Sequence, residues 1–157
     1  MQKITPFLWF DTQAEEAAQF YVSIFENSRI VNITRCGDGG PGPKGSVLTV
    51  EFDLNGLRFV GLNGGPQFRF TEAISLAVTC ETQEEVDRYW AALTAGGEEV
   101  QCGWLKDRYG LSWQITPRIL VELLGDPNPQ KAQRAMQAMM QMKKIDIAAL
   151  RRACDAV

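Results

Sequence analysis

Hydrophobic and polar positions follow two similar series along the chain, and the first series ends near residue 63. The apolar run Ile4–Phe10 predicts a buried strand. Thr12, followed by Glu15 three residues later, is typical of a helix N-terminus, and apolar residues then recur at helical spacing as far as Phe25. Strands are expected next at Arg29–Cys36, Ser46–Leu54 and Leu57–Asn63, the last two joined by an Asn55-Gly56 hairpin turn.

The second series repeats this order after a break at Gly64-Gly65-Pro66. Ile74–Cys80 predicts a strand, and Thr82 with Glu85 predicts the start of a helix that ends at Gly96-Gly97. Further strands are expected at Glu99–Trp104 and Leu111–Thr116, separated by a turn at Asp107–Gly110. Helices are expected at Arg118–Leu124, at Asn128–Met142 and from Ile145 onward with Asp146 as its cap.

Matching residues occupy matching places in the two series. Asp11-Thr12-Gln13 opens the first helix and Glu81-Thr82-Gln83 the second, while Gly56-Leu57 and Gly110-Leu111 open the last strand of each series. These anchors indicate a duplicated unit. We therefore predict an α+β fold in which two βαβββ modules form a curved mixed sheet around a ligand cleft. The chain is expected to be a single domain, with modules at 1–67 and 68–117 and extra C-terminal helices at 118–157.

The acidic composition disfavours two classes of binding partner. The net charge of −3 and the pI of about 5.0 argue against nucleic acid and anionic membranes, which require clustered Lys and Arg. No apolar run approaches the length of a membrane span, and residues 1–10 lack the pattern of a signal peptide, so a cytoplasmic location is expected. In that compartment the four scattered cysteines are expected to be buried thiols, with Cys102 as a possible reactive one.

The sequence contains no histidine, which removes the commonest metal ligand and the commonest general base. A Ser-His-Asp triad, a Cys-His dyad and a His-based zinc site are therefore excluded. Any catalysis would have to use carboxylates, Lys, Tyr, Cys or backbone dipoles.

The glycine-rich stretch Gly37–Gly45 is interpreted as a surface connection, with a mobile lid as the alternative. Its GDGG sequence is only superficially similar to a nucleotide-binding motif, because it lies between two expected strands and no helix follows it.

Aromatic side chains gather on the strands that would line the cleft, which suits a planar or apolar ligand, although core packing is the simpler interpretation of any one of them. The candidates are Phe7, Trp9, Trp104 and Trp113. Asn63 is a candidate polar group at the rim of the cleft, although a role in a hairpin or loop is the simpler interpretation.

Three segments resemble the vicinal oxygen chelate superfamily, which includes glyoxalases, extradiol dioxygenases and bleomycin-resistance proteins. These segments are TPFLWFDTQAEEAAQFYVSIF, GLRFVGLNGGPQFRFTEAISLAV and CGWLKDRYGLSWQITP, and the tail AMMQMKKIDIAALRRA also fits. More narrowly, the chain resembles the PhnB-like branch historically labelled 3-demethylubiquinone methyltransferase. The resemblance implies a glyoxalase-like fold and, in metal-using members, four ligands contributed by strands of the two halves.

At the positions that the resemblance matches to those ligands, this sequence has neutral or apolar residues. Ser75 and Gln114 occupy two of them, the first-strand ligand falls at or near Thr5 or Phe7, and the fourth falls within Leu57–Asn63, which has no acidic residue. Such a set would hold a divalent cation poorly. We therefore expect no metal or other cofactor, and we expect Ser75 and Gln114 to form hydrogen bonds with a ligand or with buried water.

These observations favour a protein that binds a small, partly aromatic or apolar molecule without a metal. The alternative is an enzyme, either an isomerase or lyase with no metal or an unusual ligand set, or the methyltransferase of the historical label. The Met-rich C-terminal helix is interpreted as core packing or as a dimer surface, and the resemblance makes a homodimer plausible. Its methionines are Met136, Met139, Met140 and Met142.

Overall fold

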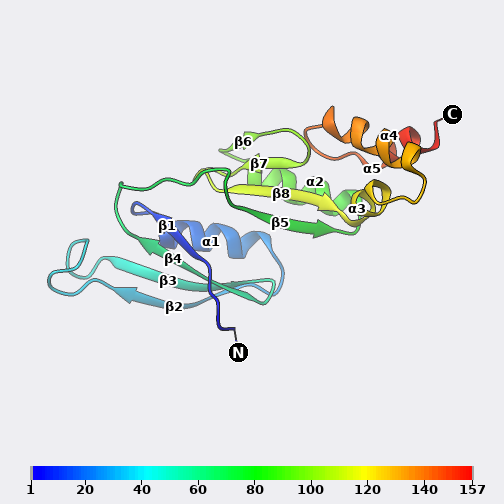
Figure 1. Cartoon of the computed structure of the whole chain (residues 1–157). Helices are drawn as coiled ribbons and strands as arrows, with labels where there is room; N and C mark the ends of the chain where they lie inside the picture. Colours follow the sequence, from blue (N-terminus) through cyan, green and yellow to red (C-terminus); the bar gives the residue numbers. More distant parts are fainter. Residues whose placement is uncertain (1, 157) are drawn as a thin grey trace. The chain divides into compact units, whose positions relative to one another are not determined.

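The computed structural model of the chain describes residues 2–156 and separates into two compact units, residues 1–70 and 71–157. Each unit has its own four-stranded mixed sheet, and the expected α+β class is confirmed (Figure 1). Whether the two sheets together form a single curved surface stays a prediction. Among residues 2–156, no helix is both long enough and apolar enough to cross a membrane.

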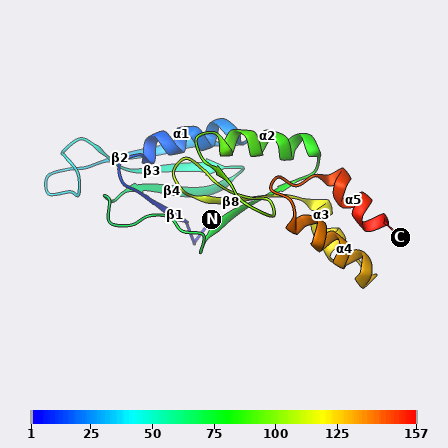
Figure 2. The same ribbon diagram turned by 90° about the horizontal axis from the view of Figure 1, so that it is seen from above.

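The first unit contains one helix and four strands. Along the chain they are β1 (Phe7–Phe10), α1 (Ala14–Ile24), β2 (Arg29–Arg35), β3 (Val47–Leu54) and β4 (Leu57–Asn63). The strand order across the sheet is β1-β4-β3-β2, with β1 parallel to β4 and the other pairs antiparallel. Helix α1 covers one face of this sheet (Figure 2).

Small residues let α1 approach its sheet closely. Ala14, Ala17 and Ala18 are fully buried on the helix, and a Cβ atom added to Gly61 would lie 3.3 Å from the Cβ of Ala14. The larger buried side chains fill the space around this contact, with Tyr21 of the helix beside Phe52 of β3 at 6.2 Å between ring centroids. The core of the unit therefore lies between α1 and the sheet.

The second unit repeats the arrangement. Its elements are β5 (Ser75–Cys80), α2 (Gln83–Thr94), β6 (Glu98–Glu99), β7 (Trp104–Lys106) and β8 (Ser112–Pro117). The strand order β5-β8-β7-β6, with β5 parallel to β8, is the order of the first unit element by element. Thr82 caps α2 as expected, because its hydroxyl accepts a hydrogen bond from the Glu85 amide at 3.2 Å. The predicted duplication is therefore confirmed.

Three local predictions are corrected. β1 begins at Phe7 instead of Ile4, because Pro6 has no N–H to donate to a sheet ladder. The cap of α1 is Gln13, without a side-chain hydrogen bond, instead of Thr12. The expected strand Glu99–Trp104 is a tight reversal between β6 and β7, since Cys102 and Gly103 have φ angles of 62° and 84°.

Three C-terminal helices follow β8 and form a small core of their own. They are α3 (Arg118–Leu124), α4 (Pro129–Met140) and α5 (Ile147–Asp155). The core consists of Leu120, Ile145 and Leu150. The segment before α5 is tied to the sheet of the second unit, because the Gly103 amide donates to the Lys143 carbonyl and the Cys102 amide to the Met142 carbonyl, both at 2.8 Å.

Gly103 offers a test of this attachment. A Cβ atom at Gly103 would lie 3.0 Å from the Ile115 carbonyl oxygen and 3.1 Å from Cγ1 of Ile145, whereas a Cβ at Gly110, with a similar φ of 87°, would meet nothing within 4 Å. Both Gly→Ala changes should cost about 1 kcal/mol of unfolding free energy through backbone strain. Gly103→Ala should cost about 1–3 kcal/mol more through overpacking. Equal urea-unfolding midpoints for the two variants would contradict this account.

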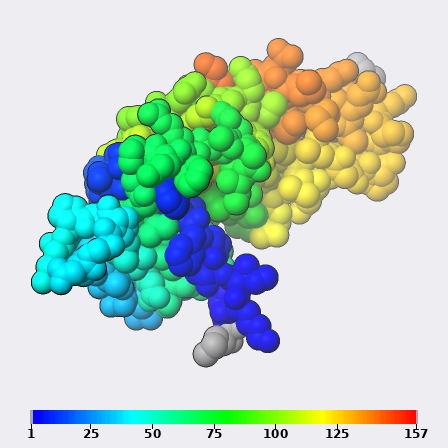
Figure 3. All heavy atoms as spheres, turned by 60° about the vertical axis from the view of Figure 1, so that its left-hand side comes forward, coloured from blue at the N-terminus to red at the C-terminus, as the bar shows by residue number. Residues whose placement is uncertain are grey.

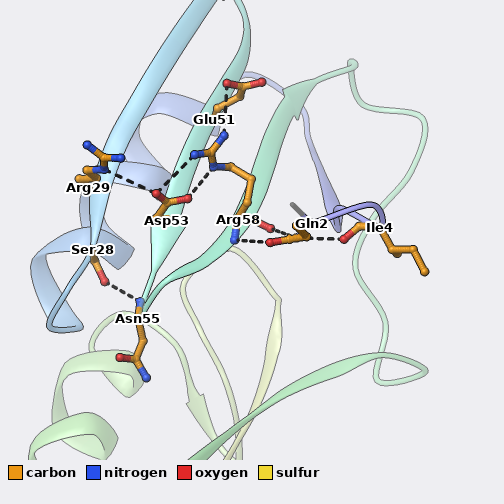
Figure 4. A network of polar contacts seen from close by, with 8 residues as sticks. All are labelled: Gln2, Ile4, Ser28, Arg29, Glu51, Asp53, Asn55 and Arg58. Atoms are coloured by element: carbon orange, nitrogen blue, oxygen red, sulfur yellow. Dashed lines mark hydrogen bonds and ion pairs between the residues drawn. The ribbon is translucent and has the colours of Figure 1, made fainter.

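A cluster of charges holds the β3–β4 hairpin (Figure 4). The turn residues Asn55 and Gly56 have φ angles of 48° and 83°, as the predicted two-residue turn requires. Arg58 Nε donates to Asp53 Oδ1 at 2.5 Å, and Arg29 Nε lies 3.5 Å from Asp53 Oδ2. The hydrogen bond from Arg58, reinforced by Arg29, lowers the pKa of Asp53 below its usual value of 3.8.

The lowered pKa predicts that the hairpin is sensitive to acid. A carboxyl group whose pKa is lower in the folded state stabilises that state above its unfolded value of 3.8, and this stabilisation is lost as the pH falls through the folded pKa. Asp53→Asn should therefore lower the urea midpoint at pH 7, and the difference from the parent protein should shrink as the pH falls below 3.8. Asp38→Asn is the control, because the side chains of Asp38 and its partner Lys44 are 89% and 73% exposed. A difference that persists at low pH would contradict the assignment.

Candidate functional site

Ser75 and Gln114, the two residues at the matched ligand positions, lie together on the sheet of the second unit. Gln114 Nε2 donates a hydrogen bond to Ser75 Oγ at 2.9 Å. Ser75 opens β5, and Gln114 lies in the middle of β8, the strand that runs parallel to it. Both side chains are partly buried. Residues from two distant parts of the sequence therefore form one neutral polar pair.

The strand register shows which residues share a face with this pair. Gln114 is opposite Trp104 of β7, and Ser112 is opposite both Ser75 and Lys106. Directly opposed residues project from the same side of a sheet, so all five side chains lie on the face of the sheet opposite α2. The hydroxyl oxygen of Ser112 is buried there without a hydrogen-bond partner among the described residues. We call these five residues the β5–β8 face.

Trp113 lies on the opposite side of the same sheet. Its ring is 2% exposed, and its paired neighbour Leu105 is fully buried, on the side where α2 packs. Trp113 Nε1 donates to Asp107 Oδ2 at 2.9 Å, and Asp107 Oδ1 accepts from the amides of Tyr109 and Leu111 at 2.8 and 3.1 Å. The structure therefore does not bring Trp113 together with Ser75 and Gln114. It does confirm the predicted turn at Asp107–Gly110.

Phe7 and Trp9 belong to β1 of the first unit. They alternate with the buried Leu8 and Phe10, so they project from the face of that sheet away from α1. Phe7 is 61% exposed. Trp9 is held in place, because its indole N–H donates to the Gly65 carbonyl at 3.0 Å and its ring meets Phe68 edge-on at 4.9 Å. Ligand binding by either residue stays a prediction.

Asn63 has a structural role, as the alternative to ligand binding predicted, and the structure shows which contacts it makes. Its Oδ1 accepts from the Ala14 amide at 2.8 Å, and its Nδ2 donates to the Val47 carbonyl at 3.0 Å. Asn63 therefore supplies, from the end of β4, the capping interaction at the start of α1 that Thr12 was expected to make. Only a contact between residues 49 positions apart shows this, so no local pattern could have indicated it.

A cavity of about 380 Å³ lies beside Asn63 in the first unit. It is bounded by the start of α1, by residues 63–66 and by the glycine-rich segment between β2 and β3, which forms the cyan lobe in Figure 3. The buried thiol of Cys36 and the carboxylates of Asp11 and Glu15 are among its lining groups. No local sequence pattern indicates this cavity, because its walls come from three segments that are far apart in the chain.

The cysteines and carboxylates of the described residues form no group of three or more that could hold a metal ion. Cys36, Cys80 and Cys154 are buried as expected, and burial raises the pKa of the Cys80 thiol to about 12. Cys102 is partly exposed on the turn between β6 and β7. The Ser75–Gln114 pair offers a hydroxyl and an amide without negative charge, which does not fit the needs of a divalent cation.

The capping contact of Asn63 can be tested by two substitutions. Asn63→Ala removes the acceptor and should cost about 1 kcal/mol of unfolding free energy. Asn63→Asp keeps an oxygen for the Ala14 amide and adds a favourable charge at the helix N-terminus, so it should retain more stability than Asn63→Ala. Chemical denaturation at pH 7 measures both. If Asn63→Asp is the less stable variant, the bond to Val47 dominates instead.

Comparisons with known proteins found one matching family and several similar solved structures. Residues 2–116 match the family described as 3-demethylubiquinone-9 3-methyltransferase. A solved PhnB protein from Bacillus cereus, whose description carries the same methyltransferase label, is 44% identical, with 74% of this chain and 99% of that chain covered and a TM-score of 0.68. No curated protein matches this chain.

Two more distant structures show the fold alone. Protein PA1353 from Pseudomonas aeruginosa is 19% identical, with 74% of this chain and 98% of that chain covered and a TM-score of 0.62. The genomically encoded fosfomycin resistance protein FosX from Listeria monocytogenes is also 19% identical, with coverages of 74% and 93% and a TM-score of 0.50. The family match ends at residue 116, so the tail Ala138–Ala153, counted in the sequence resemblance, lies outside it.

Proposed function

This chain belongs to the 3-demethylubiquinone-9 3-methyltransferase family, a PhnB-like branch of the vicinal oxygen chelate superfamily with a glyoxalase-like fold, and on that premise we propose that it binds a small, partly aromatic molecule without a metal. The observation that carries the proposal is the hydrogen bond between Gln114 and Ser75. The binding site is the β5–β8 face.

The groups on this face suit a ligand with one polar end and one flat apolar end. Gln114 keeps its amide oxygen as an acceptor, and the hydroxyls of Ser75 and Ser112 each have a proton to donate. Trp104, opposite Gln114 in the register, adds an aromatic surface beside these polar groups. A few convergent polar groups next to an aromatic wall are typical of small-molecule sites.

The alternative, catalysis on this face, has less support. Neither Ser75 nor Gln114 titrates near neutral pH, so the pair supplies no general acid or base. The family label names a methyltransferase, and the sequence lacks a glycine-rich turn between a strand and a helix of the kind that holds a nucleotide cofactor. The proposal therefore assigns binding, and no reaction, to this site.

Benzamide, a neutral aromatic amide, tests the proposal. In two-dimensional NMR it should shift the backbone amides of Ser75, Trp104 and Gln114 saturably, and equally with or without EDTA. Gln114→Leu should weaken binding about fivefold through the loss of neutral hydrogen bonds. Thr116→Val, which removes a hydroxyl two residues further along the same strand, is the matched control and should leave the affinity unchanged. Shifts confined to other residues, or a requirement for added metal, would refute the proposal.

We further propose that the chain forms a homodimer. Met136 and Met140, four residues apart on α4, are 42% and 57% exposed, while Met139 and Met142 pack against the core of the C-terminal helices. Light scattering should therefore give twice the chain mass of 17.5 kDa, and Met140→Lys should shift the protein towards the monomer. A monomeric mass at high protein concentration would overturn this proposal.

A further inference from the structure

One row of polar side chains crosses the β5–β8 face. The register places Glu98 opposite Lys106, Lys106 opposite Ser112, and Ser112 opposite Ser75. Directly opposed residues share a side of the sheet, so an ammonium group and two hydroxyls lie in one line across three strands. Glu98 is exposed at the outer end of this row, on the short strand β6. Lys106 therefore places a positive charge in the same row as Ser75, which belongs to the neutral Ser75–Gln114 pair.

The inner three groups of the row are donors. Ser75 uses a lone pair to accept the bond from Gln114, which leaves its hydroxyl proton to be donated. The Ser112 hydroxyl is buried without a partner among the described residues, an arrangement that native proteins seldom leave uncompensated. Lys106 adds up to three N–H groups on a flexible chain. Donors arranged in this way complement the two oxygens of a carboxylate.

A carboxylate of the chain itself already occupies the positive end of the row. Glu72, in the segment before β5, forms an ion pair with Lys106, and the side chains of Glu72 and Lys106 are 58% and 33% exposed. The hydrogen bond from Lys106 lowers the pKa of Glu72, so Glu72 is ionised at neutral pH. A partly exposed ion pair of this kind contributes little to stability, so its replacement by another anion costs little.

We propose that the Lys106–Ser112–Ser75 row binds the carboxylate of a small aromatic carboxylic acid, and that Glu72 covers Lys106 until the ligand carboxylate displaces it. This inference rests on the proposed function, since the aromatic part of the ligand lies against Trp104. Trp104 is two residues from Lys106 along β7, about 6.6 Å at the usual rise of a strand. That separation matches the length of a benzoate-sized molecule.

Benzoate and benzamide, which have nearly the same shape and differ in charge, test the inference by NMR titration. Glu72→Gln should raise the affinity for benzoate about tenfold, the size of one charge-assisted hydrogen bond, and leave the affinity for benzamide within about twofold. Lys106→Gln and Ser112→Ala should weaken benzoate binding more than benzamide binding. Glu84→Gln is the control, because it removes the same charge from an exposed position on α2.

The outcomes separate this inference from the proposal on which it rests. If benzamide binds at Ser75 and Gln114 but Glu72→Gln changes the affinities for both probes equally, or neither of them, the carboxylate assignment is wrong and the proposed function stands. If neither probe shifts the amides of Ser75, Trp104 and Gln114, both proposals fail. Should Lys106→Gln not fold, the comparison of Glu72→Gln with Glu84→Gln decides alone, since both positions are exposed.

Discussion

In each unit one helix, α1 or α2, covers one face of the sheet, and the other face is not covered by that helix. Strand alternation then assigns every residue to the helix side or to the opposite side. In the second unit this constraint separates neighbours in the sequence: Trp113 enters the core and bonds to Asp107, whereas Gln114 faces away from α2 and bonds to Ser75. The position of the proposed site follows from this alternation.

The same constraint explains why the two units can differ in chemistry while sharing a topology. The helix sides of both sheets are filled with apolar residues, such as Phe52 in the first unit and Ile115 in the second. The opposite sides carry side chains of different kinds in the two units. On this opposite side, the first unit has Phe7 and the Arg58–Asp53 ion pair, whereas the second unit has neutral polar groups and Lys106.

Much of the fold could be predicted from the sequence, because its signals are local. The Asn55-Gly56 turn, the Thr82 cap and the repeated order of elements all depend on residues close together in the chain. The predictions failed where distant contacts decide the geometry. Asn63 caps α1 from the end of β4, and the turn at Cys102 and Gly103 is fixed by hydrogen bonds to residues 142 and 143. The Ser75–Gln114 pair was found through family resemblance, whereas the Lys106–Glu72 ion pair required coordinates.

The neutral Ser75–Gln114 pair occupies the positions that the family resemblance matches to cation ligands, so we expect the protein to hold no transition metal. Elemental analysis by plasma mass spectrometry of protein purified without chelators, in a buffer supplemented with manganese, zinc and nickel, tests it most directly. We expect far less than one equivalent of any transition metal per chain, with the same residual level in Gln114→Leu. One tightly held equivalent that disappears in Gln114→Leu would contradict it.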